Sequence, residues 1–234
     1  AFGDRHSGAA MTSARFAKLM SGDSDSLDLD EASFIMSAVL QPGLDEIEWL
    51  VALDLIAADC PTATPEGVSR YLFEKLGFAG NKDAYYDWRN SCLDRVIETR
   101  TGIPISLSIL MIEVGRRVGV KLVGVGMPAH FLVRSADDDT TFFDPFDGGR
   151  RLDRDDARAL FETITRGQAP WSDSHLDPTP NRAIIIRMLN NLKSVFARRS
   201  DEVRFALVMQ LRGQVAELAV LEAEEFASAN AIFN

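Results

Sequence analysis

Apolar residues recur every three or four positions over much of the chain, which is the spacing of amphipathic helices. Before residue 101 the pattern occurs in the segments 31–40, 44–60, 64–79 and 87–100. Thr64 offers a capping hydroxyl to the third segment, Pro65 suits its first turn, and Gly80 ends it. The sequence therefore predicts a series of helices in this part of the protein.

The most apolar helix is expected to begin at Pro104. It continues through ISLSILMIEVGRRVG and ends at Gly119. Because a helix that is apolar almost all round must be covered on every side, we expect it in the middle of the molecule.

After this helix the spacing changes to that of strands. The runs 121–126, 129–134 and 140–144 are short and rich in Val and Phe, and they predict three strands, the last two forming a hairpin. Helical spacing returns from Asp153, a capping residue, and two amphipathic segments follow Thr179. Helices, a small sheet and then more helices indicate an α+β fold.

Composition narrows the class of protein. The chain has 234 residues, 46% of them hydrophobic and 26% charged, which is typical of a globular protein. Its net charge of −10 would repel phosphate, so we expect neither nucleic acid nor a membrane as partner. Cys60 and Cys92 lack metal-ligand spacing, and 124–126 lacks the third glycine of a dinucleotide motif, so no metal or cofactor is expected.

The first ten residues lack the apolar stretch of a signal peptide. We therefore expect a cytoplasmic protein whose natural start is Met11, preceded by an added leader. The predicted organisation is a flexible leader over 1–25, a core domain over 26–178 and a helical extension over 179–234.

Three residues could carry chemistry. Ser106 lies in the first turn of the apolar helix, His130 lies in a predicted strand, and Asp144 ends the next strand. Nucleophilic catalysis needs a nucleophile, a histidine base and a carboxylate that orients the histidine. Neighbouring antiparallel strands would place His130 and Asp144 side by side.

The run GFAGNKDAYYDWRNSCLDRVIETRTGIPISLSILMIEVGRRVGVKLVGVGMPAHFLVR, followed by FFDPFDGG, resembles the SirB-type transglutaminase-like family. The resemblance covers about residues 30–195 and implies a buried central helix packed on a small antiparallel sheet. In the wider superfamily, which includes the papain-like enzymes, the nucleophile opens this helix and His and Asp follow on strands. The resemblance therefore implies these roles for Ser106, His130 and Asp144, with Ser replacing the superfamily Cys.

Three hypotheses stay open. In the first, Ser106 attacks an amide or ester of a peptide, protein or small acyl substrate, while Leu107 and Asn90 support the oxyanion and the backbone. In the second, Ser106 only satisfies backbone donors at the helix start, and a catalytically silent module binds a peptide or protein in the same cleft. In the third, the extension, a truncated tetratricopeptide-like helix pair, serves assembly, for example as a homodimer.

Overall fold

The computed structural model describes residues 3–23 and 27–222, which form helices around a small antiparallel sheet. The helices are α1 (Gly3–Met20), α2 (Leu29–Leu40), α3 (Glu46–Ala58), α4 (Pro65–Ser69), α5 (Leu93–Thr99), α6 (Pro104–Arg117), α7 (Arg154–Thr165), α8 (Asn181–Arg199) and α9 (Glu202–Arg212). Shorter helical turns are η1 (Arg70–Lys75), η2 (Trp88–Ser91), η3 (Pro145–Asp147) and η4 (Asp173–Leu176). The arrangement confirms the predicted α+β class.

The sheet contains β3 (Leu122–Val125), β4 (Leu132–Ser135), β5 (Phe142–Asp144) and β6 (Arg150–Leu152), paired antiparallel in chain order. A separate parallel pair joins β1 (Ala79–Gly80) to β2 (Thr101–Gly102). The sequence predicts β3, β4 and β5 but misses β6. Arg150 and Arg151 are exposed in this short strand, so the strand lacks the apolar run that would have signalled it.

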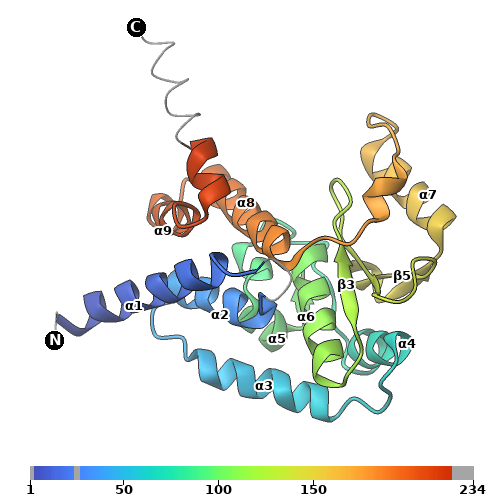
Figure 1. The fold of residues 1–234 in the computed structure, drawn as a ribbon, viewed down its shortest axis with the longest axis horizontal. Coiled ribbons are helices and arrows are strands. Elements are labelled where there is room, and N and C mark those ends of the chain that lie inside the picture. Colours follow the sequence, from blue (N-terminus) through green and yellow to red (C-terminus); the bar gives the residue numbers. More distant parts are fainter. Residues whose placement is uncertain (1–2, 24–26, 223–234) are drawn as a thin grey trace, which may run out of the picture.

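Helix α6 is the central helix that its composition predicts. Every residue from Pro104 to Gly115 is buried. In Figure 1 α6 lies between α5 and β3, and α2, α3 and α4 also contact it. The first turn of α6 therefore lies where the sheet meets the 81–92 segment.

The sheet separates two apolar clusters. Along β4 and β5, Val133 and Phe143 face α6 and the main core, whereas Leu132 and Phe142 face α7 on the other side. This is the period-2 alternation expected of strands that are covered on both faces. Figure 1 shows α7 on the side of the sheet away from α6.

Two expectations need correction. The segment 87–100 is not one helix, because Cys92 has an extended backbone between η2 and α5. The 1–25 segment is not wholly a leader either: Phe16 and Met20 of α1 are buried in the main core. Residues 1–2 and 24–25 of that segment, residue 26 of the predicted core domain and residues 223–234 of the predicted extension lie outside the described residues.

The C-terminal helices share the main core instead of forming a separate one. Ile184 and Leu189 of α8 and Val208 of α9 belong to the same apolar cluster as α2 and α6. Within the described residues, none of the helices is both long enough and apolar enough to cross a membrane.

Candidate functional site

The structure brings His130 and Asp144 together, as the antiparallel strands predict. His130 lies just before β4, and its Nε2 is 2.9 Å from Asp144 Oδ2 at the end of β5. Both side chains are buried. Asp144 Oδ1 also accepts the N–H groups of Phe146 and Asp147, at 3.1 and 3.3 Å. The carboxylate is therefore fixed by η3 and in turn orients the imidazole ring.

The turn before His130 is held in an unusual conformation. Ala129 has a φ of 62°, in the left-handed region that costs about 1 kcal/mol for a residue with a side chain. Arg187 of α8 stabilises the turn, because its Nη2 donates to the carbonyls of Met127 and His130, each at 2.8 Å. Strained backbone that surrounding contacts maintain is common at functional sites.

The hydroxyl of Ser106 is hydrogen-bonded to backbone groups of Ile103 and Asn90. Ser106 is the third residue of α6 and is 1% exposed. Its Oγ donates to the carbonyl of Asn90 at 2.6 Å and accepts the N–H of Ile103 at 3.1 Å. Among the hydrogen bonds of the described residues, none joins Ser106 to His130. The hydroxyl therefore stabilises the start of α6 and ties it to η2.

The two residues expected to support an oxyanion are also engaged. The N–H of Leu107 donates to the Ile103 carbonyl at 3.1 Å inside the helix. The Asn90 amide donates to the carbonyls of Ala84 and Tyr85, at 2.7 and 3.2 Å. Asn90 thus holds the backbone of the 84–90 segment, and its support of an oxyanion stays a prediction.

A cleft opens beside His130 and has two parts that share four residues, namely Tyr85, Pro104, Ala129 and His130. The larger part has a volume of about 430 Å³, and Phe146, Leu160 and Ile164 form its apolar wall. The smaller part, of about 100 Å³, is lined further by Ile103, Ile105, Phe131, Arg187 and Asn191. We call the two parts together the His130 cleft. Among the residues that line it, none is Ser, Thr or Cys.

Burial changes the ionisation of groups at the cleft. It raises the pKa of Tyr85 above its usual value and lowers the pKa of Arg187. Cys92 is a less suitable nucleophile than Ser106. It is buried next to η2, and burial raises the pKa of its thiol. The thiol therefore stays protonated and packs as a small apolar group.

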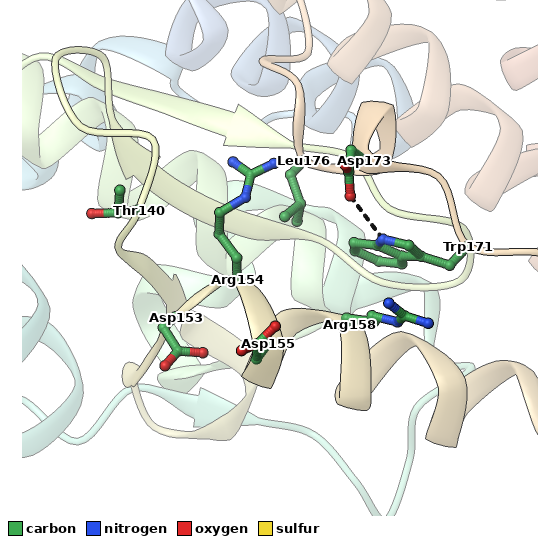
Figure 2. A pocket seen from close by; sticks show the side chains of 8 residues that line it. All are labelled: Thr140, Asp153, Arg154, Asp155, Arg158, Trp171, Asp173 and Leu176. Carbon is green, nitrogen blue, oxygen red and sulfur yellow. Dashed lines mark hydrogen bonds between the residues drawn. The ribbon is translucent and has the colours of Figure 1, made fainter.

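Another cavity lies on the far side of the sheet, between α7 and η4, and Figure 2 shows its lining. Its volume is about 400 Å³. Several of its polar groups already have partners: Trp171 Nε1 donates to Asp173, and Arg158 pairs with Glu162. None of the predicted catalytic residues lines this cavity. Within the described residues, no group of three or more His, Cys, Asp or Glu side chains could hold a metal ion.

The sequence reasoning missed Arg187 and Asn191. Both lie on α8, four residues apart and hence on one helix face. Polar residues at this spacing within the apolar stretch IIIRMLNNL could have indicated that α8 presents a polar face to something other than solvent.

Gly124 and Gly126 also have a role that the sequence did not show. A Cβ at Gly124 would lie 2.6 Å from the Phe131 ring, and one at Gly126 would lie 3.1 Å from Arg187 Nη1.

Comparison with known proteins identifies the family. A UPF0162 protein of Xylella fastidiosa is 50% identical over 134 residues, which is 56% of this chain and 48% of that protein. A UPF0162 protein of Vibrio cholerae is 28% identical over 200 residues, 80% of this chain and 72% of that protein. Mouse F-box only protein 21 is 42% identical over 69 residues, 30% of this chain and 11% of that protein. No solved structure matches.

The chain spans about half the length of the Xylella relatives. The sequence profile of the transglutaminase-like superfamily matches residues 40–190, a segment that contains α6, the whole sheet and the His130–Asp144 pair. This protein is therefore a member of the transglutaminase-like superfamily.

Proposed function

We propose that this transglutaminase-like protein binds a peptide segment in the His130 cleft and does not transfer acyl groups through Ser106. One observation carries the proposal: the buried Ser106 hydroxyl donates to the Asn90 carbonyl, whereas the residue that α6 presents to both parts of the cleft is Pro104. A nucleophile must lie within hydrogen-bond reach of its base, and proline has no group to offer.

The hydrogen bonds of Ser106 make a change of its orientation costly. Turning the hydroxyl toward the cleft would leave the Ile103 N–H and the Asn90 carbonyl without their partner in a buried region. An unsatisfied buried polar group costs about 1–3 kcal/mol. The structure therefore favours the second of the hypotheses raised by the sequence.

The walls of the cleft suit a peptide. Phe146, Leu160 and Ile164 offer an apolar surface to a side chain, and the smaller part next to them contains a guanidinium and an amide. A peptide presents apolar and polar groups at neighbouring positions, so it can use both parts at once. Mostly apolar pockets with a few placed polar groups are typical binding sites.

A binding measurement with matched variants tests the proposal. A random peptide library is selected on the protein, and the dissociation constants of the selected peptides are measured by fluorescence polarisation. Ile164→Arg places a long charged side chain in the cleft and should weaken binding at least about tenfold. Leu55→Arg, on the exposed face of α3, should leave binding unchanged. Ser106→Ala should also bind like the wild type.

Two outcomes would overturn the proposal. Peptides that bind Ile164→Arg as tightly as the wild type do not occupy the cleft. The second is turnover of p-nitrophenyl acetate, or of a glutamine peptide with an amine, by the wild type but by neither Ser106→Ala nor His130→Ala. That result would establish the Ser-His-Asp mechanism instead.

A further inference from the structure

Arg187 is a half-buried cation at the small end of the His130 cleft. Its Nη2 donates to the Met127 and His130 carbonyls, and its guanidinium carbon lies 5.4 Å from the centre of the Phe131 ring. Among the described residues, no carboxylate forms an ion pair with Arg187, and neither its Nη1 nor its Nε has a hydrogen-bond acceptor. Part of the guanidinium is therefore available to a ligand.

Several other arginines that are partly or fully buried have carboxylate partners, whereas the buried Arg134 bonds to the backbone carbonyls of Ser135 and Asp138. Arg182, on the same helix, makes two 2.8 Å bonds to Glu217. Arg117 pairs with Asp30, Asp54 and Glu113. Arg187 differs from Arg134 in its position, because Arg187 lines the His130 cleft and Arg134 lines neither of its two parts. Withdrawing a cation from water without a counter-charge is unfavourable, and burial lowers the pKa of Arg187 accordingly.

The neighbours of Arg187 are hydrogen-bonding groups and apolar walls. Asn191 lies one helical turn further along α8 and lines the same small cavity, together with Tyr85. The volume of about 100 Å³ suits a group of a few atoms and not a whole side chain. A guanidinium and an amide that line so small a space match the two oxygens of a carboxylate.

We propose that Arg187 and Asn191 form a carboxylate-binding subsite at the small end of the His130 cleft. This inference rests on the proposed peptide-binding function and adds the anchoring group: the bound peptide presents a carboxylate there. The carboxylate belongs to the C-terminus of the peptide or to an Asp or Glu side chain, and the test separates these two sources.

Three small probes test the subsite on the intact protein. N-acetylleucine carries a terminal carboxylate, N-acetylleucinamide carries none, and N-acetylglutamic acid α-amide carries one on its side chain. Binding is followed by ¹H–¹⁵N NMR through the side-chain amide of Asn191 and the backbone amide of Ala129. At least one acid should bind about tenfold more tightly than the leucinamide, because hydrogen bonds to a charged acceptor are stronger than those to a neutral amide. The acid that does so identifies the source of the carboxylate.

A matched pair of variants assigns the preference to one side chain. Arg187→Gln keeps a donor for the Met127 and His130 carbonyls but removes the charge, so the acid-to-amide ratio should fall to about one. Arg182→Gln removes an arginine of the same helix that lies in the Glu217 ion pair, and its ratio should match that of the wild type. A role of Arg187 limited to folding would change all probes alike and would leave the ratio unaltered.

The outcomes separate the two proposals. Equal binding of acids and amide in the cleft overturns the carboxylate subsite and leaves the peptide cleft standing. Absence of any shift at Asn191 or Ala129 with millimolar probes overturns the subsite as well, while selection of cleft-dependent peptides still decides the proposed function. If Arg187→Gln does not fold, the acid-to-amide ratio of the wild type decides alone.

Discussion

At the scale of single residues, the start of α6 depends on one hydroxyl. Ser106 joins the Ile103 N–H to the Asn90 carbonyl and so connects the central helix to the segment that carries Tyr85. Ser108, two residues further on and equally buried, makes only a helix-type bond to the Pro104 carbonyl at 2.8 Å. The two serines therefore differ in what their removal would leave unsatisfied.

Ser106→Ala should lower the free energy of unfolding by about 1–3 kcal/mol, because it leaves two buried backbone groups without their partner. Ser108→Ala is the matched control and should cost less, since carbonyls within a helix also accept the bond of the helix itself. Urea denaturation of the two variants measures the difference. Equal stability of Ser106→Ala and the wild type would contradict this account.

Asp144 is expected to act on stability through both of its oxygens. Asp144→Ala removes the His130 partner and the acceptor for η3, and we expect a loss of about 2 kcal/mol. Asp144→Asn keeps an oxygen that accepts from the Phe146 N–H, so it should recover part of the loss. Thermal unfolding followed by circular dichroism ranks the variants, and equal melting temperatures for Ala and Asn would refute the contribution from the η3 bonds.

At the scale of elements, an ion pair between Arg182 and Glu217, which we call the clamp, joins α8 to the C-terminal helical residues 216–222. Arg182 donates from Nε and Nη2 to the two carboxylate oxygens of Glu217, and these hydrogen bonds lower the Glu217 pKa to about 2. A carboxyl whose pKa is lowered in the folded state stabilises that state above its unfolded pKa, and the contribution disappears as the pH falls through the folded value. The clamp should therefore weaken between about pH 4.5 and pH 2.

Glu217→Gln should remove this pH dependence. At pH 7 we expect a loss of only about 0.5 kcal/mol, because the carboxylate is half exposed and water screens the pair. Glu48→Gln, on the exposed side of α3, is the control and should change neither value. Unfolding curves between pH 7 and pH 2 provide the measurement, and a Glu217→Gln curve parallel to that of the wild type over pH 4.5–2 would contradict the clamp.

At the scale of the whole molecule, one apolar core joins the N-terminal helices, α6 and the C-terminal helices. Phe16 of α1 is fully buried in it although it belongs to a segment in which the sequence suggested a leader. Val203 of α9, in contrast, is 75% exposed, and it would become buried in the interface if the predicted homodimer formed through α9. Light scattering of the wild type and Val203→Glu tests that dimer, which stays a prediction.

Phe16→Ala should lower the free energy of unfolding by about 3 kcal/mol, since a buried phenyl ring leaves a cavity when it is removed. Val203→Ala should stay within about 0.5 kcal/mol of the wild type, as expected of an exposed position. Chemical denaturation compares the two. A neutral Phe16→Ala would restore the interpretation of the N-terminal segment as a leader.

The sequence by itself determined the helical series, the central position of α6, three of the four strands of the main sheet and the meeting of His130 with Asp144. These features follow from local signals, namely the spacing of apolar residues, capping residues and the alternation of two adjacent strands. Only the tertiary structure decided where the Ser106 hydroxyl points, because its acceptor, Asn90, lies sixteen residues away in another element. It also decided that Arg187, 57 residues from His130 in the chain, reaches the turn beside that histidine. Contacts between distant segments depend on how helices pack, and the periodicity of a single segment does not encode that packing.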